Sequence, residues 1–178
     1  MIDQCTQPLQ AEEADKLCEA CESLEEKLIV WTLLDTGMRI SELCNLKAEQ
    51  ILRQKKAIRI NGRKSQERVV PMSKRVQTLL DHYFAINNHW PVGTRQAQKI
   101  VKQVAEKAKL SRMVTPHTLR RTFFENFALQ KGLSLADIKE ILVQYRLRDK
   151  WNVRKPAVGS YDELFQALHD RTSSIGEI

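Results

Sequence analysis

The sequence has no long apolar run and no targeting segment. No stretch approaches the roughly 18 consecutive apolar residues that a transmembrane helix needs. Residues 1–10 lack the basic segment followed by an apolar one that marks a secretory leader. Internal repeats, low-complexity tracts and a dividing linker are also missing. These absences predict a single cytoplasmic domain spanning residues 1–178.

A metal-binding cysteine pattern is incomplete. Cys18 and Cys21 have the C-x2-C spacing of zinc ligands, but no second C-x2-C or H-x3-H pair follows. Both cysteines fall within a helical pattern, and thiols in a reducing compartment usually serve as small core residues. We therefore expect neither a metal nor another cofactor.

What is present is a basic chain of ordinary domain size. The 178 residues are 42% hydrophobic, which is enough to build a substantial core. Lys and Arg number 29 against 22 Asp and Glu, giving a formal charge of +7. This surplus is consistent with a nucleic-acid partner, but many basic proteins never bind DNA. Charge alone leaves the function open.

The first part of the chain has a helical pattern. Apolar residues recur at steps of four and three from Leu17 to Trp31, which predicts one helix from about Ala11 to Asp35. Gly37 is expected to cap its end. A short helix opening at Ser41 then places Arg39 at a sharp corner between two helices, a rigid position for a charged side chain.

A change of pattern after residue 57 predicts strands. Ile58 and Ile60 alternate with Arg59, and apolar residues return at 69–70 after a polar stretch, as in two antiparallel strands joined by a basic turn. Pro71 should end the second strand. Further helices are expected to begin at Ser73, Thr94, Thr115 and Ser134. In the third of these, His117 and Arg120 are three residues apart and share one face.

Three motifs occur in order along the chain. Residues 34–46 read LDTGMRISELCNL, residues 62–71 read GRKSQERVVP, and residues 117–120 read HTLR. Together they resemble the catalytic motifs of the tyrosine recombinases, the phage integrase family. The resemblance implies an α+β, mostly α-helical chain with the family's catalytic DNA breaking-rejoining fold and a small antiparallel β-sheet at one edge. It also implies that the family's N-terminal core-binding domain is absent from residues 1–178.

The chemistry that the resemblance implies suits the motif residues. A tyrosine attacks a DNA phosphodiester and forms a 3′-phosphotyrosyl intermediate without metal or ATP. The planar guanidiniums of Arg39 and Arg120 can hold the non-bridging oxygens with paired hydrogen bonds. His117, one helical turn before Arg120, can donate a hydrogen bond to the phosphate or help to move the nucleophile's proton.

The leaving 5′-oxygen needs a proton, which the resemblance assigns to a lysine on the hairpin turn. By register from Pro71, Arg63 stands at that lysine position and Lys64 follows it. Because arginine is a poor proton donor, we expect Lys64 to act as the acid and Arg63 to bind phosphate. The alternative is that Arg63 occupies the site and protonation is slower.

The resemblance places two further site residues near the C-terminus. Gln144 takes the position of the family's third histidine, or sometimes tryptophan, and glutamine can bond a phosphate oxygen but cannot shuttle a proton. Tyr145 follows too closely to be the nucleophile, so Tyr161 is expected to attack. Additional contacts to DNA are expected from Arg63, Arg68, Arg121, Arg146 and Arg148.

Each residue also has a plain structural explanation. Arg39 can satisfy helix carbonyls, His117 can begin a helix, and Tyr161 can pack its ring, but these explanations do not account for the joint order of the motifs. The resemblance implies a site-specific recombinase or integrase of a mobile element, acting on double-stranded DNA as a homo-tetramer on paired sites and as a monomer without DNA. The alternatives are a DNA-binding relative with weakened or lost catalysis and a type IB topoisomerase-like enzyme.

Overall fold

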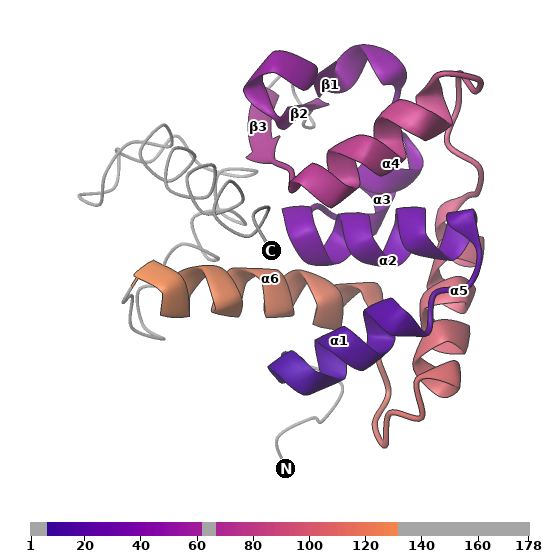
Figure 1. The fold of residues 1–178 in the computed structure, drawn as a ribbon, viewed down its shortest axis with the longest axis vertical. Coiled ribbons are helices and arrows are strands. Elements are labelled where there is room, and N and C mark those ends of the chain that lie inside the picture. The colour runs from indigo at the N-terminus through magenta and orange to yellow at the C-terminus, as the bar shows by residue number, and fades with distance from the viewer. Residues whose placement is uncertain (1–6, 62–66, 132–178) are drawn as a thin grey trace.

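A computed structural model of the chain describes residues 7–61 and 67–131. Figure 1 shows the arrangement of their elements. In chain order these are α1 (Ala11–Glu19), α2 (Leu24–Thr36), α3 (Ile40–Cys44), η2 (Ala48–Gln50), β1 (Ile51–Leu52), η3 (Arg53–Lys55), β2 (Ala57–Asn61), β3 (Glu67–Pro71), α4 (Lys74–Phe84), α5 (Thr94–Lys107) and α6 (Pro116–Lys131). The helix expected from Ser134 lies outside the described residues.

Helix α2 forms the centre of the described fold. Its buried residues are Leu28, Ile29, Val30, Thr32, Leu33, Leu34 and Thr36. Because these buried residues point to several sides of the helix, other elements must cover it from several directions. Helices α1, α3, α4, α5 and α6 all contact α2, and Figure 1 shows α2 between α4 on one side and α1 and α6 on the other. The end of α2 is therefore held from several directions.

The single helix expected from Ala11 to Asp35 is wrong, because the chain forms α1 and α2 with a break at residues 20–23. Ser23 begins α2: its hydroxyl accepts a hydrogen bond from the Glu26 N–H at 3.1 Å, and its own N–H donates to the Glu26 carboxylate at 3.1 Å. This reciprocal capping starts a new helix although the apolar spacing continues across the break. Gly37 ends α2 as predicted.

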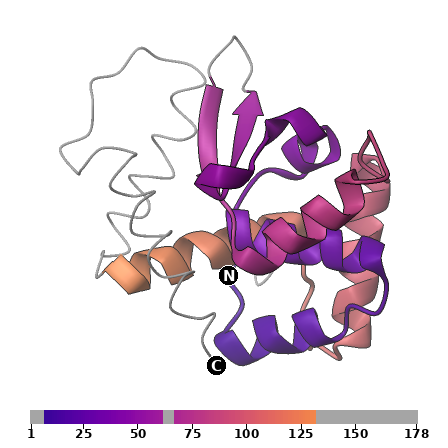
Figure 2. The ribbon, with the colours of Figure 1, turned by 45° about the horizontal axis from the view of Figure 1, so that its top comes forward.

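The predicted pair of strands is confirmed. Strand β2 pairs antiparallel with β3, with Ile58 opposite Val70, and β3 ends at Pro71. A third strand, β1, pairs with β2 on its other side. The sequence did not predict β1, because two residues are too few to show an alternating pattern. Figure 2 shows the sheet at one edge of the helical body.

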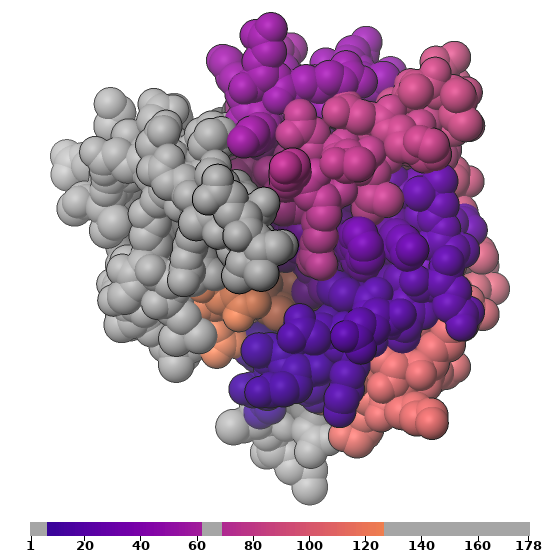
Figure 3. Space-filling model, viewed as in Figure 1, coloured from indigo at the N-terminus to yellow at the C-terminus, as the bar shows by residue number. Residues whose placement is uncertain are grey.

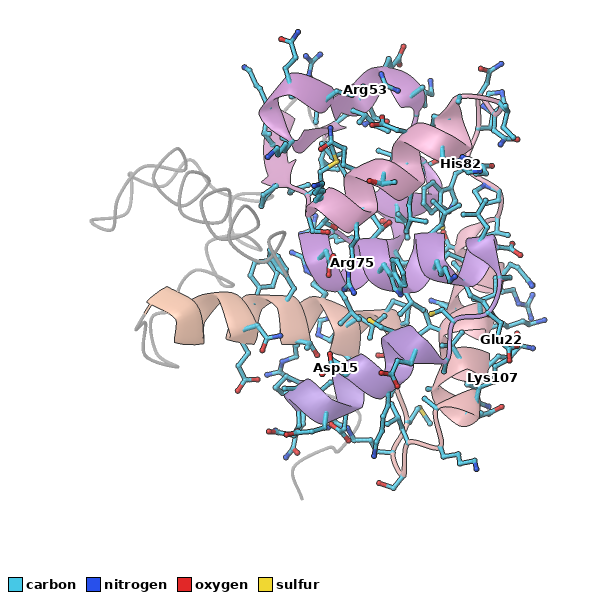
Figure 4. All side chains as sticks on the ribbon, viewed as in Figure 1. Asp15, Glu22, Arg53, Arg75, His82 and Lys107 are labelled. Carbon is cyan, nitrogen blue, oxygen red and sulfur yellow. The ribbon has the colours of Figure 1, made fainter. Side chains whose placement is uncertain are left out.

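Several contacts join the N-terminal part of the chain to the later helices α5 and α6. The buried Leu9 donates its backbone N–H to the Thr122 hydroxyl on α6 at 2.8 Å. Near the other end of α1, Lys107 of α5 lies 2.8 Å from both Glu22 and Glu26, and Figure 4 labels Glu22 and Lys107 next to each other. In Figure 3 the N-terminal helices pack directly against the later helices. The described residues thus share one core.

Within the described ranges, no helix is long and apolar enough to cross a membrane. Nor do three His, Cys, Asp or Glu side chains in these ranges gather as a metal ion would require. Cys21 is 4% exposed, and burial, with a smaller effect of the neighbouring Cys18, raises its pKa to about 12. Burial thus favours the protonated thiol of Cys21.

Candidate active site

The turn after α2 has a defined backbone path that leads to Arg39. Gly37 has a φ of 61°, in the left-handed region, and its N–H donates to the Leu33 carbonyl at 3.1 Å. The Thr36 hydroxyl donates to the Thr32 carbonyl at 2.6 Å and accepts from the Met38 N–H at 3.3 Å. Threonine and glycine together thus end the helix and turn the chain sharply.

Arg39 is the first residue after this turn and the N-cap of α3. Its backbone N–H donates to Glu42 Oε2 at 2.7 Å, and its guanidinium Nη1 lies 3.6 Å from Glu42 Oε1. The side chain of Glu42 is only 12% exposed, whereas that of Arg39 is 35% exposed. Glu42 therefore contacts both the backbone and the guanidinium of Arg39, while about a third of the Arg39 side chain stays exposed.

Glu42 is the site residue that the sequence reasoning missed. The sequence presented it only as a residue of the short helix, yet the structure gives it two contacts to Arg39. The available signal was its spacing, because a carboxylate three residues after an N-cap residue can bond back to that residue's N–H. Glu42 positions Arg39.

Arg120 reaches the same turn from α6. Its Nη1 donates a hydrogen bond to the Gly37 carbonyl, which is 83 positions away in the sequence. Its guanidinium carbon also lies 4.9 Å from the centre of the Phe124 ring, within the range of a cation–π contact. Arg120 is therefore held at the turn that leads, two residues later, to Arg39. The structure brings the two motif arginines to one region.

A close approach of α6 to the turn makes this possible. A Cβ atom added to Gly37 would overlap with Cδ1 of the Phe123 ring, so only glycine leaves room for this ring. Phe123 in turn packs edge-on against Phe124, with ring centres 5.3 Å apart. The glycine thus serves two purposes, because its φ and its missing side chain are both required.

His117 lies at the start of α6. Thr115 caps this helix as predicted: its hydroxyl accepts from the Thr118 N–H at 3.2 Å, and its N–H donates to the Thr118 hydroxyl at 3.1 Å. His117 is exposed, and its spacing of three residues from Arg120 puts both on one side of α6. The helix thus presents the histidine to solvent and one turn later holds the arginine at Gly37.

The remaining expected site residues divide into two groups. Arg121 is on α6 and partly buried, and Arg68 belongs to β3, where only its backbone is described. The others lie outside the described residues: Arg63, Lys64, Gln144, Arg146, Arg148 and Tyr161. Their roles stay predictions.

Comparison with known proteins identifies the family. The model of the phage integrase family matches residues 7–143, which contain the Gly37 turn and both arginines. The chain belongs to this family. The curated tyrosine recombinase XerA of Pyrococcus horikoshii is 30% identical over 149 residues, which cover 75% of this chain and 51% of XerA. The chain therefore spans about half the length of the curated relatives that it matches.

Solved structures confirm the predicted fold of this phage integrase family member. A crystal structure of XerA recombinase has a TM-score of 0.67 and 23% sequence identity, covering 100% of this chain and 66% of XerA. The XerH recombinase bound to its difH substrate in a pre-cleavage complex has a TM-score of 0.63 and 20% identity, covering 97% of this chain and 53% of XerH. The mostly helical catalytic fold with a small antiparallel sheet is thus shared.

Proposed function

We propose that this protein is a site-specific DNA recombinase that cleaves and rejoins DNA through a 3′-phosphotyrosyl intermediate, without metal or ATP. The observation that carries the proposal is the bond from Arg120 to the Gly37 carbonyl, which brings one motif arginine to the turn that presents the other. Membership of the phage integrase family supports the same chemistry.

The two arginines supply the electrostatic part of the reaction. Attack on a phosphodiester builds up charge on the non-bridging oxygens, and guanidiniums arranged beforehand stabilise that charge best. Glu42 holds Arg39 while leaving it partly exposed, and Gly37 and Phe124 hold Arg120. Both arginines are therefore positioned before the phosphate binds, and His117 can donate a further hydrogen bond to the phosphate or help to move the proton of the nucleophile.

Bond exchange requires a nucleophile and an acid. The phenolic oxygen of Tyr161 attacks the phosphorus, a new P–O bond forms to tyrosine, and the bond to the 5′-oxygen breaks. Lys64 gives the 5′-oxygen its proton, His117 receives the phenolic proton, and Gln144 donates a hydrogen bond to the phosphate. Religation reverses these transfers with a 5′-hydroxyl from the partner strand.

Double-stranded DNA is the proposed partner. XerH, which shares this fold, was solved with its difH substrate, and a formal charge of +7 favours binding to phosphates. Arg63, Arg68, Arg121, Arg146 and Arg148 are the proposed backbone contacts, and assembly on paired sites is a homo-tetramer. The cytoplasmic location expected from the sequence remains a prediction.

A covalent trapping experiment tests the proposal. The full chain is incubated with nicked duplexes that have a randomised central segment, and DNA linked to protein is separated on denaturing gels and sequenced. We expect an adduct on a defined site with the parent protein and none with Tyr161→Phe, since the phenolic oxygen is the attacking atom. Failure of the parent to form any adduct, with binding retained, contradicts the proposal.

That last outcome defines the second candidate function, a DNA-binding relative with weakened or lost catalysis. Three departures from the family pattern favour it: arginine in place of the hairpin lysine at Arg63, glutamine in place of the third histidine at Gln144, and a tyrosine, Tyr161, that lies farther along the chain than the family pattern places it. A plasmid relaxation assay separates a third case, because relaxation without a preferred site indicates a type IB topoisomerase-like activity.

A further inference from the structure

Asp35 stands in an unfavourable local position. It lies in the last turn of α2, which contains no basic residue, and a carboxylate near a helix C-terminus is repelled by the helix dipole. The last turn of α2 thus offers no cation to compensate for this charge. The groups that stabilise the Asp35 carboxylate must therefore come from another element.

Both carboxylate oxygens of Asp35 are bonded to the start of α4. Oδ2 accepts from Arg75 Nε at 2.6 Å and from the Ser73 hydroxyl at 2.5 Å, and Oδ1 accepts from Arg75 Nη2 at 2.6 Å. Two parallel bonds between a guanidinium and a carboxylate fix orientation as well as distance. We name these three residues, Asp35, Ser73 and Arg75, the Asp35 junction.

The surroundings of the junction make it rigid. The side chain of Asp35 is 15% exposed, and the Arg75 guanidinium lies 4.9 Å from the centre of the Trp31 ring. Burial by itself lowers the pKa of Arg75, but the hydrogen bonds that Arg75 donates to Asp35 and the negative charge of Asp35 raise that pKa above the ordinary value. An arginine that is both paired in this way and stacked on an aromatic ring has few alternative rotamers. Figure 4 labels Arg75 beside α2.

The junction connects two parts of the proposed active site. On one side, Asp35 comes two residues before Gly37 and four before Arg39. On the other side, Ser73 is the N-cap of α4, and only Met72 separates it from Pro71 at the end of β3. One carboxylate therefore ties the arginine turn to the strand that leaves the basic hairpin.

We propose that the Asp35 junction is a positioning device: it holds the end of β3 at a fixed place relative to the Gly37 turn, so that the acid proposed between β2 and β3 meets the leaving oxygen. The inference rests on the proposed recombinase function. It assigns Asp35, Ser73 and Arg75 no contact with DNA. Their effect passes through β3 to the hairpin and through α2 to Arg39.

A matched ion pair provides the control. Arg53 Nε lies 2.6 Å from Asp81 Oδ1, and this pair also ends on α4, but it joins that helix to η3 and not to the arginine turn. Asp35→Asn and Asp81→Asn each neutralise one carboxylate that lies 2.6 Å from the Nε of its partner arginine. A general loss of stability in α4 affects both variants, whereas a loss of positioning affects only the first.

The test compares two leaving groups. Four proteins are compared: the parent, Asp35→Asn, Arg75→Lys and Asp81→Asn. Each reacts in single turnover with a saturating amount of the duplex that is trapped by the parent. The duplex carries either an ordinary phosphodiester or sulfur in place of the bridging 5′-oxygen. A thiolate leaves without a proton, so a misplaced acid slows only the oxygen substrate. The ratio of the two rates is independent of how much of each variant is folded.

We expect Asp35→Asn and Arg75→Lys to lower the rate on the oxygen substrate by at least about tenfold, and to keep nearly the parent rate on the sulfur substrate. Asp81→Asn should have the parent ratio. Equal slowing on both substrates, or equal ratios in Asp35→Asn and Asp81→Asn, overturns the inference. Absence of any adduct with the parent protein instead overturns the proposed function.

Discussion

Gly37 combines two separate requirements in one residue. Its φ of 61° is costly for any residue with a side chain, and Phe123 occupies the space where a Cβ would be. The carbonyl of the same residue accepts the bond from Arg120. A change at Gly37 therefore reaches the backbone path to Arg39, the packing of α6 and the placement of Arg120 together.

For Gly37→Ala we predict a loss of about 2 kcal/mol or more in the free energy of unfolding, from the left-handed backbone and from overpacking. Chemical denaturation measures it. Gly93→Ala is the control, because a Cβ there meets nothing within 4 Å and φ is −81°. The control should stay within about 1 kcal/mol of the parent, since a weaker N-cap and a less flexible unfolded chain offset each other. Similar losses in the two variants would contradict this explanation.

At the scale of elements, Glu26 joins the start of α2 to α5. It accepts from the N–H groups of Glu22 and Ser23 at 2.8 and 3.1 Å, and from Lys107 at 2.8 Å. Burial alone raises the pKa of this carboxyl, but the hydrogen bonds from Lys107 and from the two backbone groups outweigh burial and lower it. The charged form is therefore favoured in the folded protein.

This shift predicts a pH dependence of stability. A carboxyl whose pKa is lower in the folded state stabilises the protein above its unfolded value of about 4.3, and that contribution is lost as the pH falls through the folded value. In Glu26→Gln the free energy of unfolding should therefore fall less steeply than in the parent as the pH drops below about 4.3. Denaturation across a pH series measures this slope. Glu19→Gln, at an exposed position at the end of α1, should keep the parent slope. A parent slope in both variants would disprove this role of Glu26.

At the scale of the whole molecule, Thr122 on α6 bonds to Leu9, which lies 113 positions earlier in the sequence. Its hydroxyl donates to the Thr118 carbonyl at 2.9 Å and accepts from the buried Leu9 N–H at 2.8 Å. Nearby, Arg112 donates to the Pro8 carbonyl at 2.5 Å and pairs with Glu13 at 3.3 Å. The segment before α1 is thus fastened to α6, which carries His117 and Arg120.

Thr122→Val keeps the side-chain shape but leaves the Leu9 N–H without its acceptor, so we predict a loss of about 1–3 kcal/mol in unfolding free energy. Thr78→Val is the matched control. The Thr78 hydroxyl also donates to the carbonyl four residues earlier, at 3.0 Å, but this residue is exposed on α4. Faster hydrogen exchange at Leu9 in Thr122→Val would locate the effect, and equal stability of the two variants would refute it.

The sequence by itself determined the local elements that depend on neighbouring residues. Pro116 after Thr115, Gly37 after Thr36 and the alternation around Ile58 each specify backbone geometry through contacts a few residues away. Capping at Ser23 was equally local, but the continuous apolar spacing concealed it, so one helix was expected where two occur. Both motif arginines were also found in this way, because the family pattern lies in short runs of sequence.

Only the tertiary structure decided what meets across the chain. The bond from Arg120 to the Gly37 carbonyl, the approach of Phe123 to Gly37 and the junction of Asp35 with Ser73 and Arg75 all join residues that are far apart in the sequence. Such contacts depend on how α2 is packed between α4 and α6, and no local pattern encodes that packing. Short-range hydrogen bonds thus shaped each element, and the packing of α2 against the helices around it placed the elements around one turn.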